Sequence, residues 1–438
     1  MGLVGSLFGQ ESILTDRLPE RSMGGLEALL EAAMTQSTSI RIRDLIEDNY
    51  EGRSLVSKSS KQFKLGGTAK FRKEQDVEKA DSEIRDRVYY SLTLSKTLYH
   101  WGALEANKDK GNLSLQMEEL KTFEAYRTLA LSVRKSYLNI LIARKNIETS
   151  EKSLELYRKQ LELEEKRFET GAASHIQVYD LTLRVNGAEL DILKKENVMQ
   201  DQIDVLARLV GVSSSDVERS LSKDIPKSES LDSAQIQALE NFFDGGIEQS
   251  AALGQSAKAV EYYQKDLHIA NQRRKPKIGM SVGMTQYDLD ERGTRRAEEI
   301  FYGGVSISWS IFDGSATRGY KRSAMAQVEQ MKARFEDAKS SYRFNLERAQ
   351  RLLDVNARIL KRDEAALDIA IRHAKEAGQE LDEGRISFVD VGRVEQILVA
   401  QELRTYRSRA AYLNALSTIA SQLGLDPFAR KFIDSRTQ

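Results

Sequence analysis

Cysteine is absent from the 438-residue chain, and this absence removes several classes of chemistry. Without thiols the protein has no disulfide, no zinc thiolate site and no cysteine nucleophile. The same absence is compatible with an oxidising compartment.

Long apolar runs and a net charge are also missing. No window approaches eighteen uninterrupted apolar residues, so the sequence predicts no transmembrane helix. Lys plus Arg and Asp plus Glu both number 66, and this neutrality gives no reason to propose nucleic acid as a partner. The stretch from Met1 to Gln10 lacks a basic n-region and a full apolar h-region, so we predict no secretory signal peptide in the given sequence.

Proline is rare, and the few prolines leave very long helix-compatible runs between them. The four prolines are Pro19, Pro226, Pro276 and Pro427. One proline-free run, from Gly102 to Gly171, has a single internal glycine and would be about 100 Å long as continuous helix. Apolar residues recur at every seventh position along its second half, which is typical of a seam that faces a partner helix. They are Ile140, Ile147, Leu154, Leu161 and Phe168.

The run ends in a sequence that predicts a tight turn between two helices. Gly171 is followed by Ala172, Ala173 and Ser174. Glycine ends helices because it accepts a positive φ, and a serine in this position is suited to cap the next helix. We therefore predict a return helix from about His175 to Val210 and a long antiparallel hairpin with a tight tip. Along the return helix, apolar residues again recur at every seventh position: Val178, Val185, Ile192, Met199 and Leu206.

The same hairpin occurs twice in the sequence. A second run starts near Gly314, and its tip carries Gly384, Arg385, Ile386 and Ser387. The return helix ends near Gly424, and the spacing from Gly384 to Gly424 equals the spacing from Gly171 to Gly211. Equal spacings of this kind indicate an internal duplication.

Each half also carries two shorter segments with period-two alternation. Before them we predict an irregular segment over residues 1–23, a helix from Gly24 to Tyr50 and a polar loop from Glu51 to Gln62. In the first half, the alternating segments run from Phe63 to Phe71 and from Tyr90 to Leu94, with a charged connection between them. In the second half, they run from Ile278 to Thr285 and from Val305 to Ile311. A helix from Ser233 to Ala270 precedes the second pair, and a turn from Asp288 to Gly293 joins its strands. The predicted division is 1–23, 24–225, 226–425 and a tail at 426–438.

One face of each predicted strand is apolar, and the other carries Ser, Thr, Gly, Lys or Arg. A soluble sandwich would give this pattern, and so would a membrane barrel with apolar residues toward lipid and small polar residues toward a wet lumen. Aromatic residues gather mostly at strand ends, as an interfacial belt would require. Four strands cannot close a wide barrel, so a barrel would need several chains.

Taken together, these features resemble the TolC family of outer-membrane efflux proteins. The resemblance extends from about Leu26 to Leu425. It rests on the junction Ser308-Trp309-Ser310-Ile311-Phe312-Asp313-Gly314, on the tip Gly384-Arg385-Ile386-Ser387-Phe388-Val389-Asp390-Val391, and on the duplicated order of elements. A weaker copy of the junction runs from Ser95 to Gly102.

The resemblance implies a mainly α fold with β: duplicated helical hairpins forming an α-helical tunnel, and four strands per chain in a trimeric 12-stranded transmembrane β-barrel. It implies a homotrimer in outer-membrane lipid, with its tunnel in the periplasm. It also implies two partners, a periplasmic adaptor (membrane fusion) protein and an inner-membrane pump of the RND, ABC or MFS type. The protein itself would be the passive conduit of an efflux or type I secretion system.

The resemblance also places a periplasmic gate near the tips. Two aspartates one turn apart in the best-known member correspond here to Asp390 and Arg393, and its first-half aspartate corresponds to Gln177. An arginine that helps to lock its gate corresponds to Ile386, beside Arg385. The adaptor would contact both tips, at Gly171, Ala172, Ala173 and Ser174 and at Gly384, Arg385, Ile386 and Ser387.

Two alternatives remain open at this level. Asp390 and Arg393 are spaced as an ordinary exposed helix pair, worth about 0.2–0.5 kcal/mol. The whole chain could also be a soluble coiled-coil scaffold, as the polar composition and missing signal suggest.

Catalysis is not expected from this sequence. None of the four histidines is spaced with a second metal ligand, no serine has a histidine base placed for it, and no glycine-rich phosphate loop occurs. We predict no enzyme activity, no metal and no cofactor.

Overall fold

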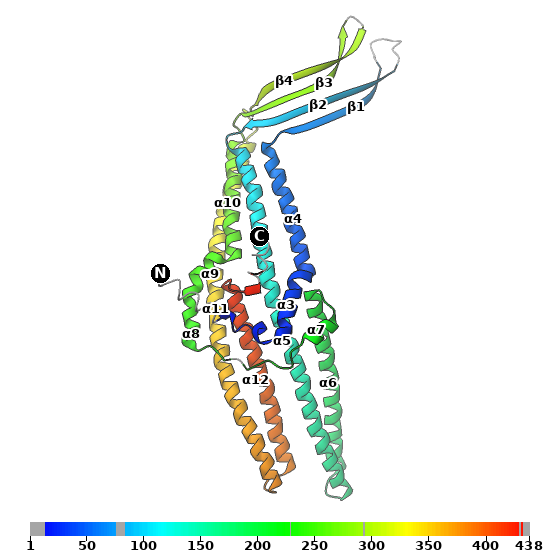
Figure 1. Cartoon of the computed structure of the whole chain (residues 1–438), viewed down its shortest axis with the longest axis vertical. Coiled ribbons are helices and arrows are strands. Elements are labelled where there is room, and N and C mark those ends of the chain that lie inside the picture. Colours follow the sequence, from blue (N-terminus) through cyan, green and yellow to red (C-terminus); the bar gives the residue numbers. More distant parts are fainter. Residues whose placement is uncertain (1–13, 76–83, 228, 292–293, 429–430, 432–438) are drawn as a thin grey trace. The chain divides into compact units, whose positions relative to one another are not determined.

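The computed structural model describes residues 14–75, 84–227, 229–291, 294–428 and 431 (Figure 1). The chain divides into two compact units, which we describe separately. Unit 1 comprises Met1–Asp44, Lys121–Ala251 and Lys339–Gln438, and unit 2 comprises Leu45–Leu120 and Ala252–Ala338. Within the described ranges, no helix combines the length and the apolarity needed to span a membrane.

Two long helical hairpins contain about half of the chain. The first pairs α5 (Ala103–Glu169) with α6 (His175–Val210), and the second pairs α11 (Ala316–Asp382) with α12 (Phe388–Gln422). Helices α5 and α11 have 67 residues each. Their first residues are 213 positions apart (316 − 103), and so are the tip glycines (384 − 171). The duplicated hairpins are therefore confirmed, whereas the division of the whole chain at residue 225 stays a prediction.

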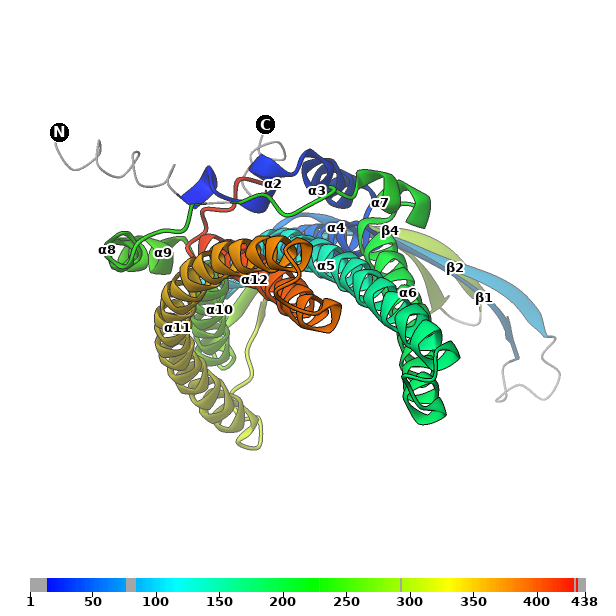
Figure 2. The same cartoon turned by 90° about the horizontal axis from the view of Figure 1, so that it is seen from below.

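The four hairpin segments of unit 1 lie side by side around a large apolar core. Seen from below, α12 lies between α11 and α5, and α6 lies on the other side of α5 (Figure 2). Each of these helices contributes fully buried residues to the core, among them Tyr137, Leu206, Leu353 and Leu416, each 0% exposed. Burying one such large apolar side chain stabilises the fold by about 1.5–3 kcal/mol.

Short helices of unit 1 cover this core. They are α2 (Pro19–Ser22), α3 (Gly24–Gln36), α7 (Ser214–Ser220), α8 (Ser233–Gln237), η2 (Ala238–Phe242) and α9 (Phe243–Gln249). The apolar face predicted for the first helix is buried in the core: Leu26, Leu29, Leu30, Ala33 and Met34. Helix α3 thereby covers the side of the core that the long helices leave open.

A smaller apolar cluster lies nearer the first tip, inside the first hairpin. It is made by Ile147 and Leu154 of α5 with Val185 and Ile192 of α6. These four residues belong to the two seven-residue repeats read from the sequence. The prediction that the repeats form the seam of the hairpin is confirmed here.

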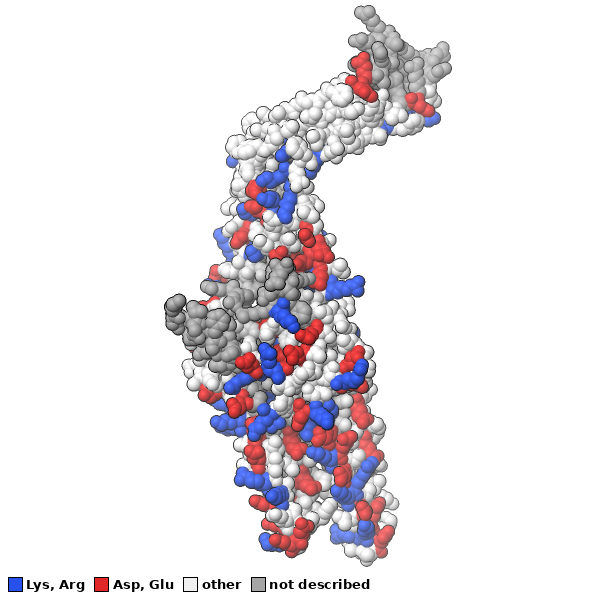
Figure 3. Space-filling view, in the orientation of Figure 1, with Lys and Arg blue, Asp and Glu red and all other residues white. Residues whose placement is uncertain are grey.

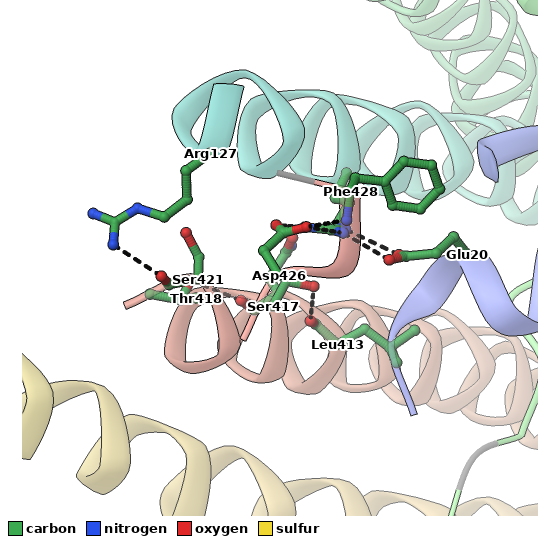
Figure 4. Close-up of polar contacts among 10 residues, drawn as sticks. Glu20, Arg127, Leu413, Ser417, Thr418, Ser421, Asp426 and Phe428 are labelled. Carbon is green, nitrogen blue, oxygen red and sulfur yellow. Dashed lines mark hydrogen bonds and ion pairs between the residues drawn. The ribbon is translucent and has the colours of Figure 1, made fainter. Parts of the chain in front are cut away.

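A buried ionic cluster, which we call the clasp, fixes both chain ends to α5. Arg134 donates hydrogen bonds to Glu20 of α2 and to Asp426 after α12, at 2.9 Å for Nε to the first carboxylate and 2.5 Å for Nη1 to the second. All three side chains are at most 2% exposed. Figure 4 shows the carboxylates of Glu20 and Asp426 converging from two different segments. Burial alone would lower the pKa of Arg134, but the two carboxylates raise it above its ordinary value.

Unit 2 contains the parts of α5 and α11 next to their first residues, most of α4 (Thr38–Lys58), α10 (Ala251–Gln272) and a four-stranded antiparallel sheet. The strands are β1 (Lys64–Glu74), β2 (Arg85–Tyr99), β3 (Lys277–Glu291) and β4 (Thr294–Ser308), in the order β1-β2-β3-β4. The first and last strands have no partner on their outer edges within the described chain. The visible surface of this sheet is nearly free of charged side chains, whereas the helices carry many of both signs (Figure 3).

The strand register separates a polar face from an apolar face. Thr93 of β2 is opposite Gly283 of β3, which is opposite Tyr302 of β4, and the Tyr302 hydroxyl lies 2.7 Å from that of Thr93. A Cβ on Gly283 would lie 2.4 Å from the Leu92 carbonyl oxygen and 2.8 Å from the Tyr302 hydroxyl, so only glycine lets the tyrosine cross the strand here. On the other face, Leu94 is opposite Val282. The two-faced strand pattern predicted from the sequence is thus confirmed.

The loop predicted over residues 51–62 is wrong, because α4 continues to Lys58 and a 3-10 turn, η1 (Ser59–Lys61), follows. Its serines pack closely against α5. Ser54 is 1% exposed and donates to the Asn112 side chain at 3.2 Å, and a Cβ on Gly111 would lie 2.5 Å from the Cβ of Ser57. Small residues on both helices therefore allow a close contact, which the polar composition of this stretch did not predict.

The single helix predicted from Gly24 to Tyr50 is also wrong, because it breaks at Ser37 between α3 and α4. Ser37 is extended, and its hydroxyl donates to the Leu209 carbonyl of α6 at 2.8 Å. The helix is thus interrupted at the residue whose side chain binds a carbonyl of another helix.

The helix predicted from Ser233 to Ala270 is likewise divided, into α8, η2, α9 and α10. The breaks let Leu239, Phe242 and Phe243 enter the core together, and the Tyr342 hydroxyl donates to the Gly246 carbonyl at 3.0 Å. Tertiary packing here prevails over helix continuity.

Four predictions near the strands and the first residues need correction. The charged connection after Phe71 is partly strand, with an ion pair of 3.6 Å between Lys73 and Asp86 across β1 and β2, and the predicted turn from Asp288 is strand as far as Glu291. The last strand stops at Ser308, because the Trp309 indole donates to the Arg274 carbonyl at 2.9 Å instead. The segment predicted as irregular over residues 1–23 contains α2 and buries Leu14, Leu18 and Met23, while its first thirteen residues lie outside the described residues.

Candidate functional site

The candidate site consists of the two hairpin tips, which close by the same backbone geometry. At tip 1, Gly171 has φ +75° and donates to the Phe168 carbonyl at 2.9 Å, and Ala172 donates to the Arg167 carbonyl at 2.7 Å. This pair of bonds is the Schellman motif, which satisfies the last carbonyls of a helix and requires a left-handed residue. Glycine adopts that conformation without the steric cost that a Cβ would add.

Tip 2 repeats the motif 213 positions later. Gly384 has φ +72° and donates to Leu381 at 2.9 Å, and Arg385 donates to the Glu380 carbonyl at 2.8 Å. The turn predicted from the two glycines is therefore present at both tips.

Each return helix starts with a capping box. At tip 1, Ser174 accepts from the Gln177 backbone N–H at 3.4 Å, and the Gln177 side chain accepts from the Ser174 N–H at 2.8 Å. At tip 2, Ser387 and Asp390 make the corresponding bonds at 3.3 and 3.4 Å. Gln177 and Asp390, both predicted as gate residues, are thus equivalent positions that also cap their own helices.

Charge distinguishes the two caps. The Ser387 hydroxyl donates to the Asp390 carboxylate at 2.6 Å, and Arg393 lies 3.7 Å from its other oxygen. The hydrogen bonds from Ser387, and to a smaller extent the Arg393 charge, hold the pKa of Asp390 below its ordinary value. Gln177 carries no charge at the same place in tip 1.

The four predicted gate residues do not form one cluster in a single chain. The structure brings Asp390 and Arg393 together, pairs Arg385 with Glu383, and leaves Gln177 in the other hairpin. Both members of the Asp390–Arg393 pair are at least half exposed. The residues predicted to contact an adaptor are mostly exposed at both tips, with Ala173 and Ile386 half-buried.

The sequence analysis missed an aromatic stack at tip 1. The Phe168 and His175 ring centroids are 4.1 Å apart, and those of His175 and Tyr179 are 5.7 Å apart with nearly parallel planes. The four-residue spacing of the last two on one helix is the signal that could have predicted it. The equivalent positions of tip 2 hold Leu381, Phe388 and Gly392, so tip 2 has no such stack.

Polar side chains join the two hairpins above the tips. Lys152 of α5 lies 3.1 Å from Glu402 of α12, and Lys145 lies 4.0 Å from the same carboxylate. A groove of about 240 Å³ runs beside this pair, lined by Leu156 and Lys159 of α5 and by Leu398 and Val399 of α12, among others. A Cβ on Gly392 would lie 3.0 Å from the Gln160 side-chain nitrogen, so the hairpins approach closely again beside tip 2.

Comparison with known proteins identifies the family. A sequence model described as "Outer membrane efflux protein" matches residues 62–212 and 246–425, which is more than half of the chain. The chain belongs to the outer membrane efflux protein family. The matched ranges contain both tips, all four strands and both long hairpins, and the predicted resemblance is confirmed. An outer membrane efflux protein acts at the outer membrane, and this is the location of the chain.

Solved outer-membrane proteins share its fold. VceC from Vibrio cholerae is 18% identical, with a TM-score of 0.74 over 93% of this chain and 98% of that one. The CmeC outer membrane channel of Campylobacter jejuni is 13% identical, with a TM-score of 0.76 over 94% and 89%. The MtrE channel of Neisseria gonorrhoeae, solved in an open state, is 14% identical, with a TM-score of 0.69 over 91% and 88%. A search of curated proteins gives no match.

Proposed function

We propose that this chain is the outer-membrane channel of a tripartite efflux or type I secretion system. It acts as a passive conduit, and the proposal includes no catalytic step. The observation that carries it is the family match across both hairpins and the sheet, which supports a channel over the coiled-coil scaffold.

The sheet supports closure by further copies of the same chain. Its outer edges, β1 and β4, lack strand partners within the described chain, and its apolar face is exposed, with Leu65 66% and Phe301 75% accessible. An open, apolar edge strand tends strongly to pair with a strand of another chain. A homotrimer would pair β1 of one chain with β4 of the next and close a 12-stranded barrel in outer-membrane lipid.

Exposed apolar seams on two helices of unit 1 support the same homotrimer. On α6 the seam comprises Ile176, Tyr179, Leu183, Leu190 and Leu193, each at least 58% exposed. On α11 it comprises Leu352, Val355, Ile359 and Ile369, each at least 41% exposed. Both follow the three-and-four spacing of coiled-coil contacts. Because α6 and α11 are the outer helices of the row in Figure 2, the seam of one chain would face the seam of the next.

We assign docking of a periplasmic adaptor protein to the two tips, and energy supply to an inner-membrane pump of the RND, ABC or MFS type. The exposed tip residues, from Gly171 to Ser174 and from Gly384 to Ser387, would make the adaptor contact. Their backbone is rigidly capped on both sides, which presents a defined surface for a partner.

The gate in this proposal is less anionic than a ring of paired carboxylates. Each chain would contribute Asp390 with Arg393 beside it, and Arg385 with Glu383 beside it, so positive and negative charges alternate near the opening. Gln177 adds a neutral side chain from the other tip. This arrangement favours weak ion selectivity.

Single-channel recording of the purified protein in planar bilayers tests the channel and its gate. We expect discrete conductance steps with little preference between cations and anions. Arg393→Asp would place two carboxylates one turn apart and raise the cation-to-anion permeability ratio, while Asp390→Asn would lower it. Absence of any conductance from correctly assembled protein would contradict the channel, and an unchanged ratio in both variants would remove these residues from the gate.

A further inference from the structure

Both tryptophans of the chain hold one short turn of unit 2. The turn comprises residues 273–276, between α10 and β3, and we call it the basic turn. The Trp101 indole, just after β2, donates to the Pro276 carbonyl at 2.9 Å, and the Trp309 indole, just after β4, donates to the Arg274 carbonyl at 2.9 Å. Because β3 lies between β2 and β4 in the sheet, the two indoles reach the turn from its two sides.

The cationic side chains of the basic turn are exposed, and none forms an ion pair within the described chain. The guanidinium carbon of Arg273 lies 3.8 Å from the centroid of the Tyr320 ring of α11, and the Lys275 Nζ lies 4.8 Å from that of the Trp101 ring. Aromatic faces attract these cations but do not neutralise them. Their positive charge therefore stays available for an anion.

The third cation of the turn is directed by the backbone. The Arg274 guanidinium donates to the Ile311 carbonyl at 2.6 Å, which uses one of its five N–H donors. The turn itself is closed by a hydrogen bond of 2.9 Å from the Lys275 N–H to the Gln272 carbonyl. Since carbonyls make all the bonds that fix the turn, most side-chain donors remain exposed.

Further cations surround the basic turn where the sheet meets the helices. Residues 273–280 and 309–328 together contain seven Lys and Arg residues but a single acidic one, Asp313. Asp313 is already engaged, because it caps α11 by accepting from the Thr317 N–H at 2.9 Å. Figure 3 shows Lys and Arg side chains on the helices next to the nearly uncharged sheet. This junction therefore carries an excess of positive charge.

The basic turn adjoins the apolar face of the sheet. On that face Val305 and Ile307 of β4 are 68% and 70% exposed, and Trp309 continues their alternation. Tryptophan is enriched where a membrane protein passes the lipid headgroups. The chain acts at the outer membrane with its tunnel in the periplasm, so the end of the sheet that joins the helices faces the periplasmic leaflet.

We propose that the basic turn binds the phosphate groups of anionic phospholipids in the periplasmic leaflet of the outer membrane. Guanidinium groups match phosphate oxygens in geometry, and clustered Lys and Arg beside a membrane segment attract anionic lipids. A zwitterionic headgroup fits less well, because its ammonium group would meet the surrounding cations. The proposal rests on the lipid contact of the sheet in the proposed function and adds a lipid preference to it.

Tryptophan fluorescence tests the proposal, because both tryptophans adjoin the basic turn and report on lipid at this place alone. Full-length protein is reconstituted into phosphatidylcholine vesicles that contain a small fraction of a lipid brominated on its acyl chains. Bromine quenches tryptophan only at short range. One sample contains brominated phosphatidylglycerol, which is anionic, and the parallel sample contains the same fraction of brominated phosphatidylcholine, which is zwitterionic.

We expect stronger quenching by the anionic lipid, corresponding to an enrichment of about tenfold or more at the turn. A single Lys or Arg beside an anionic lipid surface contributes roughly a fivefold gain in binding. Arg273→Gln, Arg274→Gln and Lys275→Gln together should therefore lower the preference for the anionic lipid by at least about fivefold. If this triple variant does not fold, Arg273→Gln with Lys275→Gln keeps the bond to Ile311 and is measured with the same expectation.

The matched control removes the same charge from α11 at a distance from the sheet. It combines Lys332→Gln, Arg334→Gln and Lys339→Gln, three exposed cations that lie at least about 24 Å along the helix from its first residue. The preference for the anionic lipid should persist in this variant. Its loss there would mean that overall charge, and not the basic turn, attracts the lipid, and it would overturn the proposal.

Two further results would overturn the lipid preference: equal quenching by the two brominated lipids in the unaltered protein, or an undiminished preference in the folded variants of the turn. Failure of the proposed barrel looks different. Neither brominated lipid would then quench the tryptophans, because the sheet would not be in contact with lipid.

Discussion

In unit 1, the same four helices form both the region of the large apolar core, which we call the base, and the two tips. The base and the tips are held together by opposite kinds of contact. At the base, Tyr412 and Leu416 are fully buried. The clasp, and the bond from the Leu231 N–H to the Tyr412 hydroxyl, fasten chain segments that are far apart in sequence. At the tips, the described contacts are exposed capping bonds, ion pairs and one aromatic stack. The difference teaches that the fold is stabilised at the base, which leaves the tips able to change contacts without unfolding the protein.

The largest expected effect comes from breaking the clasp. Arg134→Met would leave the carboxylates of Glu20 and Asp426 buried without the arginine's positive charge, and we expect it to lower the free energy of unfolding by about 3–5 kcal/mol. Arg158→Met is the matched control, because Arg158 lies on the same helix and makes an exposed ion pair of 2.6 Å with Glu189. The control should cost less than about 1 kcal/mol.

Denaturant titration of helical circular dichroism in detergent compares the two arginine variants. Equal losses of unfolding free energy in the two variants would show that the clasp stabilises the protein no more than an ordinary surface ion pair. That result would contradict the stabilising role given to the base.

The next effect concerns apolar burial. Leu416→Ala, in the centre of the core, should cost about 2–5 kcal/mol, because the cavity it leaves cannot collapse fully. Val389→Ala, 55% exposed at tip 2, should change stability by no more than about 0.5 kcal/mol. A large loss from Val389→Ala would mean that the tip is buried in the assembled protein, and thermal unfolding of both variants would reveal it.

A smaller change in stability is expected from alanine substitutions at two glycines of the second hairpin, and the two substitutions should act in opposite directions. Gly384→Ala forces a Cβ into the left-handed conformation and should cost about 1–2 kcal/mol. Gly378→Ala, in the interior of α11 with open space at its Cβ, should instead stabilise by about 0.5–1 kcal/mol. Opposite shifts in melting temperature are expected, and shifts of the same sign would contradict the observed backbone geometry at the tip.

The smallest effect compares the two caps as a function of pH. The pKa of Asp390 is depressed in the folded protein, so its capping contribution is present above the unfolded value near pH 4 and is lost as pH falls through the folded value. Amide hydrogen exchange, corrected for intrinsic rates, should therefore accelerate in the first turn of α12 at low pH. The first turn of α6, capped by neutral Gln177, is the internal control and should change much less.

The periodicity of the sequence predicted the features that depend on residues close together in the chain. The seven-residue repeats of α5 and α6 gave the hairpin seam, and the glycine and serine of each tip gave its turn and cap, because these features are encoded within a few residues. The alternating strands were predicted for the same reason, although their ends near Asp86 and Glu291 were not, since cross-strand pairing extends charged strands.

Long-range features escaped the sequence analysis. Nothing near Arg134 indicates that its partners, Glu20 and Asp426, come from the two ends of the chain. Nothing in the serine-rich stretch around Ser54 indicates its close contact with Gly111, and nothing near Ile225 indicates that its N–H donates to the Tyr406 hydroxyl. The gate residues remain predictions, because their roles depend on neighbouring chains.

Electron microscopy of the native protein, extracted in detergent from the outer-membrane fraction, tests the central claim most directly. The account predicts three-fold particles with a short barrel and a tapered helical tube of about 100 Å. Recovery of the protein only from the cytosol, as monomers or as solid rods without a barrel, would contradict it.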